Sequence, residues 1–281
     1  MKKADLKKIA FQLAKEANIN MRRDCLSLIK KAYQKEKLPL PKEALKIILK
    51  NASTAKSKHL PICQDTGLPL TFVEIPEKIV WKKELVDKIN EGIKESYKKN
   101  CLRASSVYPF SDNTAFNPQI THIEFTKSNF FSLTVFPKGF GSENKSRLRM
   151  FNPTASRNEI TDFIIDSVKK AGPEACPPFF IGVGIGGTSD YALLLAKKAL
   201  LEDVTKPNPD KMLNRWEKEI LKKVNKLAIG PMGFGGGFTA LSVKIKMSPT
   251  HIAGLPVGIN ISCYALRSAT VSLDIRKIKV V

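Results

Sequence analysis

The order of helical and extended segments along these 281 residues is the feature that most constrains the fold. In residues 4–57, apolar residues recur at helical spacing. Strand-like runs rich in β-branched and aromatic residues begin only after the loop around Cys63, and amphipathic segments then separate them. We therefore expect an α/β protein. It would be a single domain over residues 1–281, mainly helical in 1–58 and mixed α/β in 59–281.

Two strand-like runs in the mixed portion lie close together in the sequence. "QITHIEF" (119–125) and "FFSLTVF" (130–136) are separated only by the polar stretch "TKSN". Short polar connections between such runs are typical of β-hairpins. The sequence therefore predicts that these two strands pair with each other.

The net charge of +21 limits the classes of partner. The basic residues are spread along the chain with no run of five, and aromatic residues are not interleaved with them as in single-strand binders. A nucleic-acid-binding module is thus a minor alternative to small anionic substrates or a partner subunit. Lys7, Lys8, Lys15 and Glu16 interrupt any apolar leader, so we expect a soluble cytoplasmic protein.

The five cysteines are too few and too widely scattered for a disulfide framework in a chain of this length. Cys63, Cys176 and Cys263 lie in loop-like segments, and Pro177 follows Cys176 as prolines do near iron–sulfur ligands. Cys25 and Cys101 are interpreted as packing residues. Spacing alone leaves open whether the three loop cysteines form a metal site or are buried structural thiols.

Three thiolates would suit chemistry on an anionic substrate. A 4Fe-4S cluster held by three cysteines leaves one iron with an exchangeable position, which can act as a Lewis acid on a substrate oxygen. The protein must then supply proton donors and cationic groups. Asp65, Gln64 as a neutral donor, and Arg103 as a carboxylate-binding cation meet part of that need.

The run "GVGIGG", Gly182–Gly187, offers a competing interpretation. It satisfies G-x-G-x-x-G between a predicted strand and a predicted helix, as in dinucleotide-binding proteins, so an NAD-dependent dehydrogenase is one alternative. However, the acidic residues about 20 positions later, Glu202 and Asp203, end a helix rather than a second strand. His59, His122 and His251 have no metal-triad spacing, and packing is the default for them.

Several motifs together resemble one family. They are "PICQDTG", "LRASS", "KGFGSEN", "ACPP" with "GVGIGGT", "NKLAIGPMGFGG" and "HIAGLPVGINISCYALR". The chain resembles the alpha subunit, equivalent to the N-terminal half, of class I iron–sulfur fumarate hydratases and L-tartrate dehydratases. The resemblance implies that Cys63, Cys176 and Cys263 bind a 4Fe-4S cluster. It also implies that Gln64, Asp65, Arg103 and the loop at Gly141 contact the substrate, with Asp65 sharing in proton transfer. Arg267 matches the family's C-x-x-x-R without an assigned role.

The resemblance also implies an incomplete site. A separate beta subunit would supply further substrate-binding residues in a hetero-oligomer. The basic charge of this chain would serve in part as a surface for that partner and would steer dicarboxylates toward the site. Two departures bear on the substrate. The Asn113–His122 stretch, which keeps Asn117 and Pro118, is shorter than usual, and Phe140 replaces a glycine. We expect reversible hydration of fumarate to malate, with dehydration of L-tartrate as the alternative.

Overall fold

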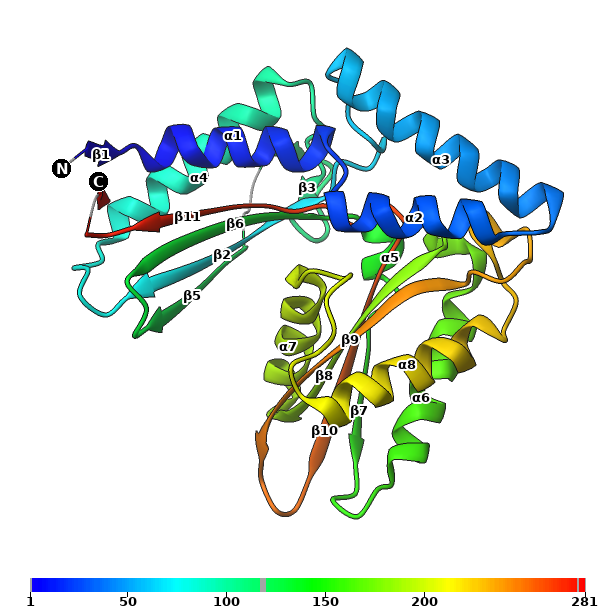
Figure 1. The fold of residues 1–281 in the computed structure, drawn as a ribbon. Coiled ribbons are helices and arrows are strands. Elements are labelled where there is room, and N and C mark those ends of the chain that lie inside the picture. Colours follow the sequence, from blue (N-terminus) through cyan, green and yellow to red (C-terminus); the bar gives the residue numbers. More distant parts are fainter. Residues whose placement is uncertain (1, 117–119, 277, 281) are drawn as a thin grey trace. The chain divides into compact units, whose positions relative to one another are not determined.

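The computed structural model describes residues 2–116, 120–276 and 278–280, with the elements shown in Figure 1. They form two compact units. The first unit comprises Met1–Arg22, Ala52–Phe140 and Arg267–Val281, and the second comprises Arg23–Asn51 and Gly141–Leu266. The single domain expected over residues 1–281 stays a prediction. Asn117 and Pro118 lie outside the described residues.

Three helices occupy nearly all of the N-terminal region, as the sequence predicts. They are α1 (Leu6–Ile19), α2 (Arg23–Lys35) and α3 (Pro39–Lys58). The Asp5 side chain accepts a hydrogen bond from Lys8 N (3.1 Å) and so caps the start of α1. Because strands and helices interleave after α3, the predicted fold class is confirmed.

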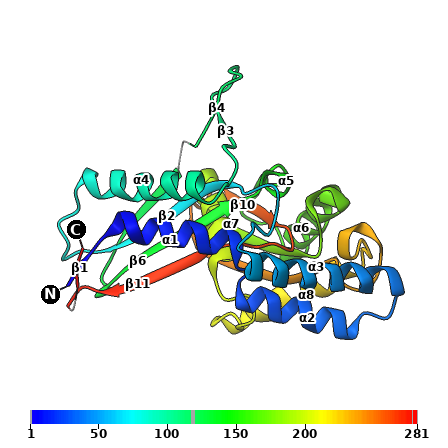
Figure 2. The same cartoon turned by 90° about the horizontal axis from the view of Figure 1, so that it is seen from above.

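The first unit is built on a four-stranded sheet covered by two helices. Its strands, in spatial order, are β11 (Ala269–Asp274), β6 (Phe130–Lys138), β2 (Leu68–Pro76) and β5 (Ile120–Thr126). Apolar residues of β2, β6 and β11 form one core with residues of α1 and of α4 (Lys83–Lys99). Figure 2 shows the small hairpin of β3 (Ser106–Val107) and β4 (Thr114–Ala115) projecting away from α4. Near the termini, β1 (Lys2–Ala4) pairs in parallel with β12 (Ile278–Val280).

The predicted hairpin of β5 and β6 is wrong. β5 pairs in parallel with β2, and β6 pairs antiparallel with the other side of β2, so β2 lies between them. Burial explains the order. Most of β2 is buried, as a central strand requires, whereas β5 is largely exposed and takes the edge. Proximity in the sequence was therefore a poor guide to pairing.

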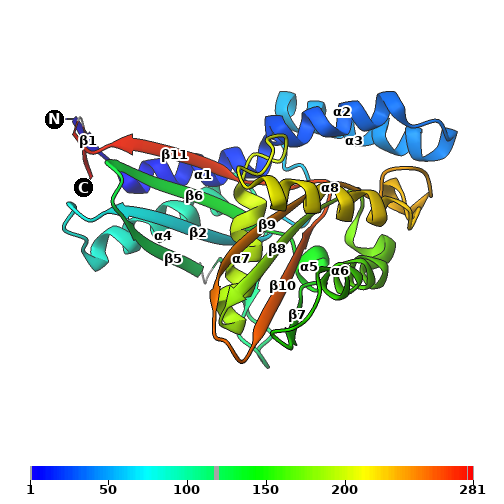
Figure 3. The same ribbon diagram turned by 60° about the horizontal axis from the view of Figure 1, so that its bottom comes forward.

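The second unit is built on a sheet that has helices on both faces (Figure 3). Its strands, in spatial order, are β7 (Arg147–Phe151), β10 (Leu255–Ser262), β8 (Phe179–Gly187) and β9 (Ala240–Thr250). Odd-numbered residues of β8 and β10 join a core with α6 (Arg157–Ala171) and α8 (Lys211–Asn225). The other face meets α7 (Ser189–Leu201).

The glycines of "GVGIGG" serve this packing. A Cβ at Gly182 would lie 2.1 Å from Ala196 O, and one at Gly184 would lie 2.0 Å from Ala192 O, both on α7. Glycine is therefore required where α7 meets β8. In a dinucleotide fingerprint the glycines follow the strand and expose their amides to a pyrophosphate, but Gly182 and Gly184 lie inside β8. The dehydrogenase interpretation loses its structural basis.

None of the helices among the described residues combines the length and the apolar character needed to cross a lipid bilayer.

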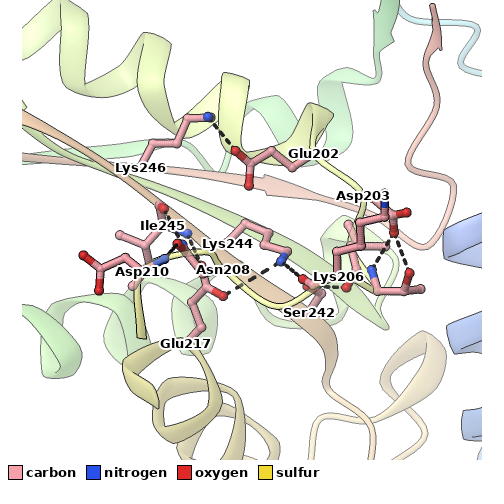
Figure 4. A network of polar contacts seen from close by, with 12 residues as sticks. Glu202, Asp203, Lys206, Asn208, Asp210, Glu217, Ser242, Lys244, Ile245 and Lys246 are labelled. Carbon is pink, nitrogen blue, oxygen red and sulfur yellow. Dashed lines mark hydrogen bonds and ion pairs between the residues drawn. The ribbon is translucent and has the colours of Figure 1, made fainter. Parts of the chain in front are cut away.

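A buried polar network fixes the loop between α7 and α8 (Figure 4). Glu217 on α8 accepts hydrogen bonds from Asn208 Nδ2 (2.8 Å) and Ile245 N (2.9 Å), and its other oxygen lies 3.9 Å from Lys244 Nζ. Lys244 Nζ also donates to Lys206 O. Burial raises the pKa of Glu217, although the Asn208, Ile245 and Lys244 contacts act in the opposite sense. The network joins α8, β9 and the loop.

We expect Glu217→Ala to lower the free energy of unfolding by about 3 kcal/mol, because it leaves the Lys244 ammonium buried without its carboxylate. Urea denaturation measures the change. Glu219→Ala, at an exposed position of the same helix, is the matched control and should change stability by less than about 0.5 kcal/mol. A loss of unfolding free energy in Glu217→Ala as small as that in Glu219→Ala would show that the buried pair does not stabilise the fold.

Candidate functional site

In the first unit, the loop that contains Cys63, Gln64 and Asp65 connects α3 to β2 and is bonded at several points. The residue before Cys63, Ile62, donates its N–H to Asn18 O (2.9 Å). The Asp65 carboxylate accepts from Gly67 N through Oδ1 (2.9 Å) and from Phe140 N through Oδ2 (2.8 Å). The loop conformation is therefore well defined, and Asp65 joins it to the end of β6.

The residues after Asp65 bring two further side chains to the loop. Thr66 Oγ1 accepts from Arg103 N (3.0 Å), which holds Arg103 beside the loop. The Tyr97 hydroxyl donates to Thr66 O (2.9 Å) and Gly67 O (3.2 Å), and burial raises the pKa of Tyr97 to about 12. Gly67 has φ +74°, and a Cβ there would lie 2.9 Å from the Lys138 backbone. Only glycine fits this turn.

The exposure of Gln64 and Arg103 suits the binding roles that the resemblance implies. Both residues are exposed, and Asp65 is half-buried. Among the described residues, no carboxylate forms an ion pair with the Arg103 guanidinium. A fork of donors that faces solvent beside this loop is suited to binding a carboxylate of a small molecule.

The second unit brings Cys176 and Cys263 onto adjoining segments. Cys176 follows the 3-10 helix η1 (Gly172–Ala175) in the left-handed conformation, φ +54°. Its carbonyl accepts from Tyr264 N (3.1 Å), so the backbone beside Cys263 contacts the backbone of Cys176. Pro177 O accepts from Met232 N (2.8 Å), which ties in η2 (Pro231–Gly233) of the glycine-rich loop.

The exposure of the five thiols separates them into groups. Cys63, Cys176 and Cys263 are half-buried, Cys25 is fully buried and Cys101 is exposed. The packing prediction therefore holds for Cys25 and is wrong for Cys101, which follows the last turn of α4. Cys63 belongs to the first unit, and Cys176 and Cys263 belong to the second. Within the part of the chain that the structure describes, no three His, Cys, Asp or Glu side chains form a group able to hold a metal ion.

The loop at Gly141 belongs to the same region of the second unit. A Cβ at Gly141 would have Glu174 O, two residues before Cys176, as its nearest neighbour, at 3.9 Å. The Lys145 ammonium pairs with the Glu174 carboxylate, which holds the loop that follows α5 (Phe140–Glu143) against η1. The sequence-predicted residues Gly141 and Cys176 therefore lie on segments in contact.

Sequence reasoning missed a second polar cluster in this loop. The Glu143 carboxylate pairs with Lys197 on α7 and accepts from Asn260 Nδ2 (2.8 Å), which also donates to Ser146 Oγ (2.7 Å). The only available signal was that Glu143 and Asn260 fall inside the motifs "KGFGSEN" and "GINISCYALR". Because Asn260 lies on β10, which ends directly before Cys263, the cluster links the Gly141 loop to the strand that precedes that cysteine.

The three histidines have other surroundings. His122 stacks on Phe72 with ring centroids 4.9 Å apart, as expected for a packing residue. His251 Nδ1 accepts from Ala253 N (3.1 Å) in the exposed turn between β9 and β10. His59 is exposed.

Comparisons with known proteins identify the family of the chain. A family model described as Fumarate hydratase (Fumerase) matches residues 7–272. "Putative L(+)-tartrate dehydratase subunit alpha" of Methanocaldococcus jannaschii is 40% identical over 270 residues, covering 93% of this chain and 95% of that protein. "Putative fumarate hydratase class I" of Geobacillus stearothermophilus is 31% identical over 279 residues, covering 94% of this chain and 54% of that protein. "L(+)-tartrate dehydratase subunit alpha" of Escherichia coli K12 is 25% identical over 253 residues, covering 88% and 84%.

The chain belongs to the fumarate hydratase family. The resemblance inferred from its motifs is therefore confirmed.

We expect Gly139→Ala to destabilise the first unit. The added Cβ would lie 3.1 Å from Asp65 Oδ2 and 3.3 Å from an Arg267 terminal nitrogen, so it would disturb the contact between Asp65 and Phe140 N. The expected loss is about 2 kcal/mol, typical of overpacking, and thermal or urea denaturation measures it. Gly254→Ala is the control, because its Cβ would meet nothing closer than Met150 Cε at 3.8 Å. A neutral Gly139→Ala would contradict the tight packing at Asp65.

Proposed function

We propose that this chain is the alpha subunit of a 4Fe-4S-dependent hydro-lyase that, with a separate beta subunit, reversibly hydrates fumarate to malate. The observation that most supports the proposal is the membership of a family whose motifs coincide with the loops of Cys63, Cys176 and Cys263. The structure adds that these three thiols share an intermediate exposure that Cys25 and Cys101 lack.

The three thiols have the chemistry that an iron–sulfur cluster requires. Thiolates are the usual ligands of such clusters, and half-buried loop positions allow both ligation and access for a substrate. The backbone bond between Tyr264 and Cys176 supports the pairing of Cys176 with Cys263 as ligands from one unit. Cys63 would be the third ligand. When bound, such a cluster supplies a Lewis-acidic iron for the C–O bond of the substrate.

The other residues would bind and orient the diacid. Arg103 presents its guanidinium to one carboxylate, and Gln64 offers an amide donor and acceptor on the same loop. Asp65 would assist proton transfer, and its two backbone hydrogen bonds fix the position from which it acts. Gly141, on the segment that contacts Glu174, would leave room beside the substrate. These roles are the ones that the family motif implies for each position.

The lengths of the relatives support the proposed beta subunit. The chain covers 95% of a relative named as an alpha subunit but 54% of a relative named as a class I fumarate hydratase. This difference supports a site that a second chain completes.

Dehydration of L-tartrate is the second candidate. The observation that favours it is the 40% identity to a protein named as a tartrate dehydratase subunit, against 31% for the one named as a fumarate hydratase. Anaerobic co-expression with a candidate beta chain, followed by parallel assays on fumarate, malate and L-tartrate, tests both. Activity on tartrate alone would replace the fumarate assignment. A chain that binds no iron and remains inactive with its partner on all three substrates would overturn the proposal.

We expect Cys63→Ser, Cys176→Ser and Cys263→Ser each to lose the iron–sulfur cluster, since each would remove one thiolate. Anaerobic reconstitution with analysis of iron and acid-labile sulfide measures this. Cys101→Ser, at an exposed position, is the matched control and should retain the cluster. Equal loading of all four variants would refute the choice of ligands.

We expect Arg103→Ala to keep its iron content but to raise KM for the diacid by roughly 10- to 100-fold. The change corresponds to the loss of a charge-assisted hydrogen-bonded contact of about 1.5–3 kcal/mol. Steady-state kinetics beside iron analysis separates binding from cluster loading. An unchanged KM would remove Arg103 from the substrate site.

A further inference from the structure

Arg267 is a buried cation with an unusual environment. Only 2% of the residue is exposed, and among the described residues no carboxylate forms an ion pair with it. Its Nε is buried without an acceptor in the described structure, and one terminal nitrogen donates to Asn18 Oδ1 (3.3 Å). Burial of a charged group with so few partners is costly. The position of this guanidinium therefore indicates a specific role inside the protein.

The acceptor Asn18 connects Arg267 to the Cys63 loop. Asn18 is fully buried at the end of α1, and its Nδ2 donates to Ala14 O (3.0 Å). Asn18 Oδ1 accepts from Arg267, and the Asn18 backbone carbonyl accepts from Ile62 N (2.9 Å). Ile62 directly precedes Cys63. A single residue thus holds both the guanidinium and the start of the loop.

The other side of the guanidinium lies near Asp65. A Cβ built on Gly139 would be 3.3 Å from an Arg267 terminal nitrogen and 3.1 Å from Asp65 Oδ2, so both groups line the same glycine. The buried Tyr97 hydroxyl donates to the loop at Thr66 O, and the charges of Arg267 and Asp65 both act on the pKa of Tyr97. Arg267 therefore lies among the groups that fix the loop.

We infer that Arg267 is a positioning residue for the Cys63–Asp65 loop, an inference that rests on the proposed function for its catalytic consequence. The guanidinium holds the side chain of Asn18, whose carbonyl in turn binds the amide of Ile62. It also lies beside Gly139, and the next residue, Phe140, donates its amide to Asp65. It is too buried to touch a substrate. Arg267 is also the first residue of the first unit after the chain leaves the second, four residues beyond Cys263.

Hydrogen exchange by mass spectrometry tests the positioning role without a cluster or a substrate. In Arg267→Met, amides of residues 60–67 and 139–140 should exchange at least tenfold faster, while the β2–β6 strand pair keeps its protection. Arg267→Lys retains the charge and should restore part of the protection. Arg215→Met, at an exposed position of α8, is the control and should match the wild type. Asn18→Ala should reproduce the exchange pattern of Arg267→Met.

Kinetics of the complex with its beta subunit then tests the consequence. Arg267→Met should lower kcat/KM by at least tenfold, because the loosened loop carries Asp65 and Gln64, the groups proposed to transfer a proton and to bind the diacid, and Arg267→Lys should restore part of the loss. Unchanged exchange in residues 60–67, or an equal increase throughout the first unit, would overturn the inference. Should Arg267→Met fail to fold, Arg267→Lys and Asn18→Ala decide by the same criteria. An inactive wild type with the predicted exchange pattern would refute the proposed function and leave the positioning role intact.

Discussion

Two backbone amides, those of Gly67 and Phe140, bind the two carboxylate oxygens of Asp65, and the candidate site depends on these bonds. Hydrogen bonds to an ionised acceptor are stronger than neutral ones, so the carboxylate can hold segments that are more than 70 residues apart in the sequence. The arrangement requires glycine twice. Gly67 turns the chain with a positive φ, and a Cβ at Gly139 would crowd Asp65 Oδ2 at 3.1 Å and an Arg267 terminal nitrogen at 3.3 Å. These bonds define the conformation of the loop that contains Cys63.

The residues around this carboxylate divide into fixed and accessible groups. Thr66 and Tyr97 are buried and bonded to the loop, whereas Gln64 and Arg103 are exposed beside it. A site that orients a diacid benefits from this division, because rigid surroundings reduce the entropy lost when the accessible groups bind. In the second unit the carbonyls of Cys176 and Pro177 accept from two other loops in the same manner. Both units thus hold their cysteine loops by backbone hydrogen bonds rather than by side-chain packing alone.

The sequence was sufficient for the fold class and for the family, but not for strand order or for the contacts that support the loops, and the predicted site residues stay a prediction. Helical periodicity in residues 4–57 identified α1 to α3. Proximity suggested that β5 and β6 pair, yet the more completely buried β2 separates them, which only the tertiary context decides. "GVGIGG" matches a nucleotide-binding motif because the letter pattern is the same for two kinds of glycine. Some glycines follow a strand and bind a phosphate, whereas Gly182 and Gly184 lie within a strand and allow a helix to pack closely against it. The bonds of Glu143 with Lys197 and Asn260, and of Arg267 with Asn18, join residues too distant in the sequence for any spacing rule.

Electrostatics separates the binding of a diacid from the choice among diacids. The net charge of +21 favours the approach of any dianion, but salt screens such a field within roughly 8 Å at physiological ionic strength. Fumarate and tartrate carry the same charge, so the field cannot discriminate between them. Discrimination requires groups that hydrogen-bond the hydroxyls of tartrate, since a site built around a hydroxyl rejects a substrate that lacks one far better than an apolar site rejects an added hydroxyl. Gln64 has such groups, whereas Phe140 adds an apolar side chain, 46% exposed, directly beside the amide that binds Asp65. Under the proposed function, the balance between these two neighbours of Asp65 is where substrate choice would be determined.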